Sequence, residues 1–209
     1  MSLLAIFLAA AALAQKPPAA PPSSNPEPSP YAPPVNAAGP AAQLAEMLDI
    51  YDSACLRAFP DERAVARVMA DRGASALSDA QVRVYLHEDP GYGWRIAGRT
   101  GIFNLTIENP PYHACAVRTM TASGFPDLGP YQALARRYEA GRGFAPMRHM
   151  QFTRDNIEVA GGGEQRSTPD GGSESLLVVV GTPIARFRAQ GDTAVEVRFT
   201  HQFAAPGAQ

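Results

Sequence analysis

The side chains best suited to chemistry in this sequence are four histidines and two cysteines. They are His87, His113, His149, His201, Cys55 and Cys115. No two histidines are four residues apart, and the cysteines lack the close spacing of a zinc-binding motif, so the sequence contains no local metal site. His113 and His201 are both expected on inward faces of strands, where they could meet in the folded chain.

The two cysteines have two interpretations. In an oxidising compartment, two cysteines in one domain most often form a disulfide bond. A Cys55–Cys115 bond would close a loop of about sixty residues and stabilise the fold by about 4 kcal/mol in the chain-entropy model. Alternatively, His113 and Cys115 share one side of a strand, so Cys115 could be a nucleophilic thiolate. The disulfide is favoured because catalysis would leave Cys55 without a partner.

Three other clusters could carry chemistry. His87–Asp89 places two carboxylates beside an imidazole, which suits acid–base chemistry or Ca²⁺ binding, although an exposed turn is the simpler explanation. Tyr92 and Trp94 could stack on a sugar ring. Gly161–Gly163 could cradle a phosphate, but no helix is expected after it, which favours a flexible hairpin loop. The chain contains no Gly-x-Ser-x-Gly motif, and no cofactor is predicted.

The N-terminal segment predicts export. Leu3–Ala14 is an uncharged, apolar run. As a helix it would span only ~18 Å, less than the ~30 Å of a bilayer core, so a signal peptide over residues 1–14 is favoured over a membrane span. Ala12-Leu13-Ala14 has the small-x-small pattern that predicts cleavage before Gln15. An uncleaved anchor is the alternative, because only the α-amino group supplies positive charge ahead of the run.

Proline dominates the next segment. Residues 16–40 contain ten prolines and almost no apolar side chains to bury, so residues 15–40 are predicted to be a disordered, semi-rigid linker. Residues 41–209 are expected to form a single domain around one core. The net charge of −2 argues against a nucleic-acid partner. The predicted location is the periplasm or the exterior, with a protein or cell-wall partner and no membrane span after cleavage.

Hydrophobic periodicity predicts an α+β domain with two N-terminal helices, a mostly antiparallel sheet of about six strands and one further helix packed on it. The first helix is predicted over Ala41–Phe59, with Cys55 pointing to the core. Ser78 and Gln81 have the spacing of a capping box, but Val82–Leu86 alternates, which favours a short turn leading into an extended segment. The other expected elements are helices at 61–73 and 125–138 and strands at 94–99, 102–108, 112–121, 148–153, 156–160, 176–180 and 194–203.

Two short segments carry a resemblance, Tyr51-Asp52-Ser53-Ala54-Cys55 and His113-Ala114-Cys115. In outline the chain resembles uncharacterised secreted proteins and lipoproteins of proteobacteria with a cysteine on their first helix. The resemblance covers most of residues 41–209 and implies export and cysteine pairing, but no activity. Unlike the lipoproteins, the chain has no cysteine near its predicted cleavage site.

These features predict an exported envelope protein that is a non-enzymatic binding or accessory module. The alternative is a small secreted hydrolase that uses His113 or His201 with a carboxylate or Arg118. Arg118 is expected on the opposite side of its strand from His113, which argues against their direct cooperation. The side chains predicted to bind a ligand are His113, His201 and Trp94.

Overall fold

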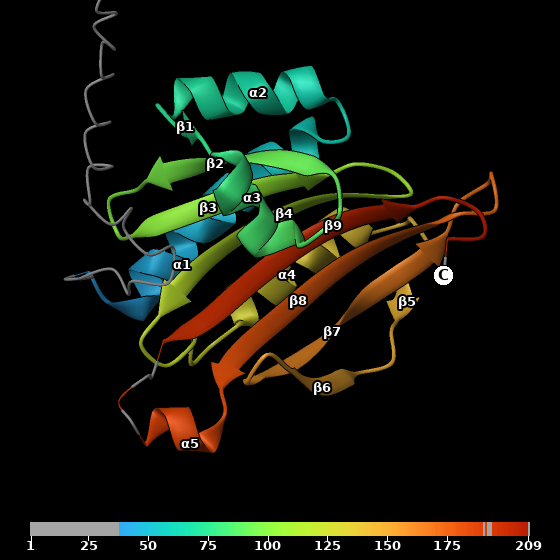
Figure 1. Ribbon diagram of the computed structural model, residues 1–209. Helices are drawn as coiled ribbons and strands as arrows, with labels where there is room; N and C mark the ends of the chain where they lie inside the picture. Colours follow the sequence, from blue (N-terminus) through green and yellow to red (C-terminus); the bar gives the residue numbers. More distant parts are fainter. Residues whose placement is uncertain (1–37, 190, 192–193, 209) are drawn as a thin grey trace, which may run out of the picture.

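The computed structural model describes residues 38–189, 191 and 194–208. The predicted signal peptide, and the predicted linker as far as residue 37, lie outside the described residues. The described chain has an α+β fold in which helices pack on an antiparallel sheet (Figure 1). Within these ranges, no helix combines the length and apolar character needed to cross a lipid bilayer.

The helices and strands occur in the following ranges. The helices are α1 (Gly39–Ile50), the π-helix η1 (Tyr51–Ala58), α2 (Glu62–Asp71), α3 (Asp79–Leu86), α4 (Gly129–Glu139) and α5 (Ala185–Arg188). The strands are β1 (Ser75–Ala76), β2 (Gly91–Ala97), β3 (Ile102–Glu108), β4 (Tyr112–Thr121), β5 (Ala145–Pro146), β6 (Met150–Arg154), β7 (Ile157–Ser167), β8 (Ser173–Pro183) and β9 (Val195–Ala204).

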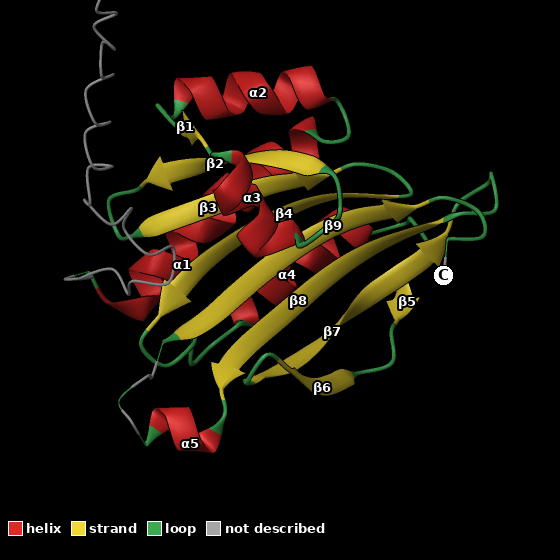
Figure 2. Ribbon diagram, viewed as in Figure 1, coloured by secondary structure: helices red, strands yellow, loops and turns green. Residues whose placement is uncertain are grey.

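The C-terminal strand β9 lies inside the sheet, between β4 and β8. Hydrogen-bonded neighbours follow the order β1-β2-β3-β4-β9-β8-β7-β5, and every pair is antiparallel (Figure 2). β6 also pairs with β7, so β5 and β6 occupy successive stretches of one edge. The two halves of the sheet therefore join only when the last strand of the chain is in place.

Helices cover the two faces of the sheet unequally. α1, η1 and α4 lie behind the sheet in Figure 1, whereas α3 lies in front of the β3 and β4 end. The first helix contacts β4, and η1 contacts β4 and β9. The large buried side chains of β3, β4 and β9 point to the face covered by α1, η1 and α4, which is called the helix face below. They include Phe103, Leu105, Ile107, Val117 and Phe199.

The first helical segment confirms the prediction that Cys55 points to the core. Met47, Tyr51 and Cys55 are fully buried, and α1 continues into η1 without an interruption because the backbone at Tyr51 stays helical. The last turns are wider than in an α-helix, with Phe59 donating its N–H to the carbonyl of Ala54 at 2.9 Å. This geometry brings Cys55 against β4, where it forms the predicted disulfide with Cys115.

Several sequence-based expectations were wrong in detail. The sheet has nine strands instead of about six, because the edge strands β1 and β5 are too short to show a periodic pattern. Val82–Leu86 belongs entirely to helix α3, which begins with the predicted capping box of Ser78 and Gln81. The short helix α5 was not expected. Gly161–Gly163 lies within strand β7 and not in a mobile loop.

The glycines of β7 allow a close approach of its neighbour β8. A Cβ built on Gly163 would lie 1.9 Å from the carbonyl oxygen of Leu176, and one on Gly161 would lie 3.0 Å from that of Val178. Real Cβ atoms do not come within 1.9 Å of a carbonyl oxygen, so only glycine fits at position 163, whereas a side chain at position 161 would require its neighbours to shift. The glycines therefore permit close packing of β7 against β8, whereas the sequence had suggested a flexible loop.

Replacing Gly163 should test this close approach. We expect Gly163→Ala to lower the free energy of unfolding by about 1–3 kcal/mol, the usual cost of adding atoms to a packed site. Gly162→Ala is the matched control, because its Cβ would contact only Nδ1 of His149, at 3.3 Å. Urea unfolding followed by circular dichroism measures both variants. An equal loss in the two variants would contradict the steric explanation.

Candidate functional site

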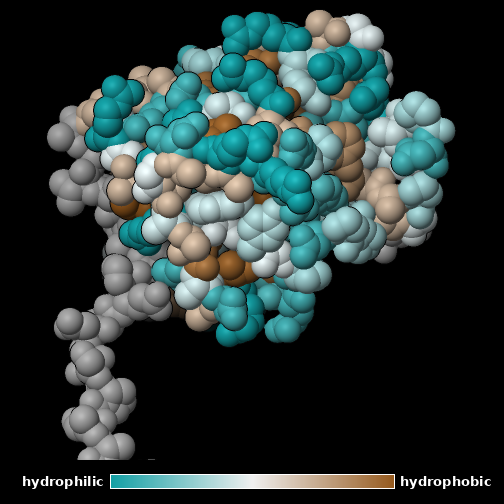
Figure 3. Space-filling model, turned by 90° about the horizontal axis from the view of Figure 1, so that it is seen from above, coloured by the Kyte–Doolittle hydropathy of each residue, from teal (hydrophilic) through white to brown (hydrophobic). Residues whose placement is uncertain are grey.

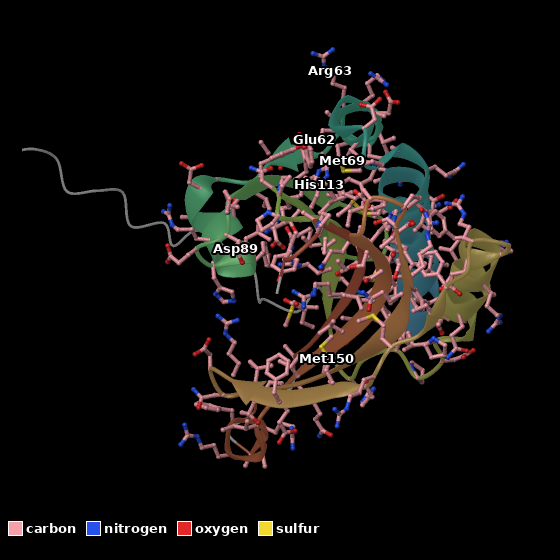
Figure 4. All side chains as sticks on the ribbon, turned by 90° about the vertical axis from the view of Figure 1, so that its right-hand side faces the viewer. Glu62, Arg63, Met69, Asp89, His113 and Met150 are labelled. Carbon is pink, nitrogen blue, oxygen red and sulfur yellow. A yellow bond between two sulfur atoms is a disulfide. The ribbon has the colours of Figure 1, made fainter. Side chains whose placement is uncertain are left out.

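The face of the sheet opposite the helix face forms a concave pocket. Its volume is about 400 Å³, within the range of ligand-binding cavities. The floor comes from alternate residues of β3, β4, β9, β8 and β7, and helix α3 supplies one wall. Looking along the sheet, Asp89 and Met150 lie on opposite sides of this concave face (Figure 4). The pocket is therefore built by strands that are far apart in the sequence.

A second hollow, of about 420 Å³, lies near Ala122–Phe125 and Val195. Among the described residues that line it, the one charged side chain is Arg188, whose guanidinium donates to the Pro183 carbonyl and lies 3.4 Å from a Glu158 carboxylate oxygen. It thus has one cation, which the fold already uses. The concave pocket offers a larger set of charged groups and is the better candidate site.

Two arginines face each other at the centre of the pocket floor. Arg118 on β4 and Arg198 on β9 are direct cross-strand partners, and both line the pocket. Like charges directly opposite each other on neighbouring strands destabilise a sheet. The cost is increased here because Arg118 is only 3% exposed, and solvent therefore screens it poorly.

Arg118 is fixed in place by neighbouring groups. Its guanidinium carbon lies 4.5 Å from the centre of the Tyr85 ring on α3, a cation–π contact. One of its terminal nitrogens donates to the hydroxyl of Thr106 at 3.4 Å. The helix α3 thereby holds the guanidinium against the floor. Its orientation is set before any ligand arrives.

Arg198 is half-buried, and its Nε is a buried donor with no hydrogen-bond partner among the described residues. Burial and the negative charge of Asp89 raise the pKa of Glu108, while Arg198 and Arg118 oppose that rise. The two arginines and these carboxylates therefore share one electrostatic environment. A buried donor without a partner is costly in a fold, and such sites are often completed by a ligand or water.

The rim carries two unusual features. His87, at the end of α3, has a φ angle of 57°, a conformation that non-glycine residues rarely adopt. Phe152, on β6, is 48% exposed. Among the described residues it is the one large hydrophobic side chain that is exposed. Both residues line the pocket, as does Asp89. The sequence predicted a polar cluster at residues 87–89. Two of its members, His87 and Asp89, therefore lie at the rim of the pocket.

Comparisons with known proteins found no match: no family model, no curated protein and no solved structure matches this chain. Its function must therefore be argued from its own geometry.

The predicted site residue His201 lies on the helix face and is fully buried. Its Nδ1 is 2.7 Å from the carbonyl oxygen of Cys55, and its Nε2 is 2.8 Å from a carboxylate oxygen of Glu174. Tyr138 and Arg166 also donate to that carboxylate. Because both ring nitrogens are engaged in the buried core, His201 braces the core beside the disulfide.

His113 and Trp94 also lie outside the pocket. The ring of Phe59 packs against both His113 and His201, at centroid distances of 4.5 and 5.6 Å. His113 Nε2 lies 3.3 Å from a Glu62 oxygen without hydrogen-bond geometry (Figure 4). Trp94 is half-buried and packs edge-on against Tyr92. These predicted binding residues share the helix face but do not form one site.

The pocket was missed by sequence reasoning, which treated the arginines as a compositional bias. The available signal was the strand period: Arg118 alternates with His113 and Cys115 and must face away from them. The register that sets Arg118 opposite Arg198 depends on residues eighty apart. Among the described residues, no group of three or more His, Cys, Asp and Glu side chains is arranged to hold a metal ion.

The buried Glu174 should make the stability of the fold depend on acid pH. Burial alone would raise the pKa of Glu174, but hydrogen bonds from His201, Tyr138 and Arg166 lower it to about 2. Because this value is below the ordinary 4.5, the ionised carboxylate stabilises the fold above that pH, and the stabilisation is lost as the pH falls toward 2.

We expect Glu174→Gln to lower the free energy of unfolding at pH 7 by roughly 2 kcal/mol. The difference from the wild type should shrink as the pH falls below 4.5. Urea unfolding at a series of pH values measures it. Glu158→Gln, which removes an exposed carboxylate paired with Arg188, is the control and should cost less than ~1 kcal/mol. A pH-independent difference for Glu174→Gln would refute the assignment.

Proposed function

We propose that this protein is an exported, non-enzymatic binding module of the cell envelope, and that its ligand enters the concave pocket. The observation that supports this most strongly is the Arg118–Arg198 pair on the floor of a cavity of about 400 Å³. Concave sites with an apolar lining and a few convergent polar groups are where small molecules bind. The two like charges repel each other across neighbouring strands, and an anionic ligand would offset that repulsion.

The chemistry of the lining favours binding over catalysis. The described residues that line the pocket include charged groups suited to hold a ligand, and their one imidazole, that of His87, stands at the exposed rim. A hydrolase would place a nucleophile within hydrogen-bond reach of a base. The histidines considered for that role, His113 and His201, lie on the other face of the sheet, away from the pocket.

A binding module could also act through an exposed apolar surface. Seen from above, over α2, the molecule is mainly hydrophilic, and its apolar areas are small and separate (Figure 3). Extended apolar patches are what mark protein-docking surfaces. On that face the surface therefore gives no support to a docking mode, which leaves the concave pocket as the better-supported route to a partner.

Export rests on two independent features. Residues 1–14 have the pattern of a signal peptide, and the Cys55–Cys115 disulfide is present in the fold. Disulfides persist mainly in oxidising compartments such as the bacterial periplasm. In this proposal the linker, from residue 15 to the start of α1, separates the folded domain from the predicted cleavage site.

Export can be checked by fractionating a Gram-negative host that expresses the full chain with a C-terminal tag. We expect a periplasmic product whose intact mass corresponds to a start at Gln15 and whose two cysteines are oxidised. Substituting Ala12 and Ala14 by Leu should block cleavage and leave the product in the membrane fraction. A cytosolic product of full length with two free thiols would contradict the proposal.

Filling the pocket should weaken binding of an apolar probe. Ala116 lies on the floor between its cross-strand partners Thr106 and Thr200. We expect Ala116→Trp to weaken binding of the neutral dye Nile red by about tenfold or more, with Ala116→Leu intermediate. Ala133→Trp, on the exposed side of α4, is the matched control. Dye fluorescence gives the affinities, and thermal unfolding verifies that each variant is folded. Unchanged binding in both Ala116 variants would contradict the pocket as the site.

A further inference from the structure

The floor of the pocket is divided into a charged part and an apolar part. One row of cross-strand partners runs from Asn104 through Arg118 and Arg198 to Val179. From the β8 end of that row onward to β7, the lining is aliphatic. The aliphatic residues are Ile157, Val159, Leu177 and Val179. Phe152, the cross-strand partner of Val159, extends this apolar part to the rim.

The charged part is suited to an anion. Two guanidinium groups in adjacent strands repel each other, and one negative group between them would convert the repulsion into two attractive contacts. Arg198 also has a buried Nε–H that lacks an acceptor among the described residues. Guanidinium groups bind the two oxygens of a carboxylate or phosphate in a fork geometry, which makes them the preferred partners of such anions.

Carboxylates near the arginines limit the charge of that anion. Glu196 is two residues before Arg198 on β9, and Glu108 lies toward the other end of the same face. The exposed rim adds Asp89, Asp155 and Arg154. A ligand with several negative groups would meet more repulsion from these carboxylates than a ligand with a single anionic group held over the arginine pair.

We infer that the pocket binds a small amphipathic anion, in which one carboxylate or phosphate ester contacts Arg198 and Arg118 and an apolar chain lies along β8 and β7 toward Phe152. This inference rests on the proposed function of the pocket and specifies its ligand class. The volume of about 400 Å³ is near the lower end of ligand cavities, which suits a short chain.

Four octyl compounds that differ in their headgroup test this inference: octanoate, octyl phosphate, 1-octanol and octylammonium. Isothermal titration calorimetry of the disulfide-intact protein measures each affinity. We expect octanoate, octyl phosphate or both to bind about tenfold or more tightly than 1-octanol and octylammonium, because only these two have the anion that the arginines need. Whichever of octanoate and octyl phosphate binds more tightly identifies the preferred headgroup, and similar affinities mean that the site accepts both.

Variants separate the two parts of the pocket. Arg198→Gln should remove the preference for the anionic compounds, and Arg198→Lys, which keeps the charge without the fork, should retain part of it. Arg137→Gln, on the exposed side of α4, should change nothing. Phe152→Ala should weaken octanoate and 1-octanol alike by severalfold, while Gln151→Ala, on the next position of β6 and facing the other way, should not.

Different outcomes refute different claims. If 1-octanol or octylammonium binds as tightly as the anionic compounds and Ala116→Trp blocks it, the pocket is a binding site but not one for anions. If the anionic compounds bind with their preference intact in Arg198→Gln, the arginine pair is not the headgroup site. If none of the four compounds binds to the wild type, both this inference and the proposed function are overturned.

Discussion

The rest of the structure depends on the covalent bond between Cys55 on η1 and Cys115 on β4. The wide turns of η1 present the sulfur of Cys55 to the sheet, and the carbonyl oxygen of the same residue accepts a hydrogen bond from Nδ1 of His201 on the adjacent strand β9. Glu174 on β8 completes this arrangement from the other side of His201. One buried cluster thus ties a helix to three neighbouring strands. The helix face is consequently closed, and its histidine and carboxylate serve stability.

Closing one face determines where ligand chemistry can occur. Strand residues alternate between faces, so the positions that interleave with Cys115 on β4 and with His201 on β9 must point away from the helices. Arg118 and Arg198 occupy such positions, and the antiparallel register makes them partners. Helix α3 adds the Tyr85 ring against Arg118. The glycines of β7 let the far strands approach closely, which brings an apolar wall within reach of the charged centre.

The sequence predicted the parts of the fold whose signals are local. The first helical segment with Cys55 on its buried side and the strands β3 and β4 follow from periodicity within ten to twenty residues. The capping box follows from the spacing of Ser78 and Gln81. The disulfide was predicted because two cysteines in an exported domain usually pair, and the structure confirms it. The pocket could not be predicted, because its arginine pair depends on the pairing of β4 with β9 across the length of the domain. Gly161–Gly163 was misjudged because glycine signals both flexibility and close packing, and only the neighbouring strand distinguishes them.

The central claim is that the face opposite the disulfide binds a small amphipathic anion with a fixed orientation. A crystal structure of the protein with 8-bromooctanoate would test it most directly, because the anomalous signal of bromine locates the end of the chain. The account predicts carboxylate oxygens within about 3 Å of the Arg198 guanidinium and bromine beside Val159 and Phe152. A probe bound on the helix face, or in the pocket with its carboxylate turned away from both arginines, would contradict the account.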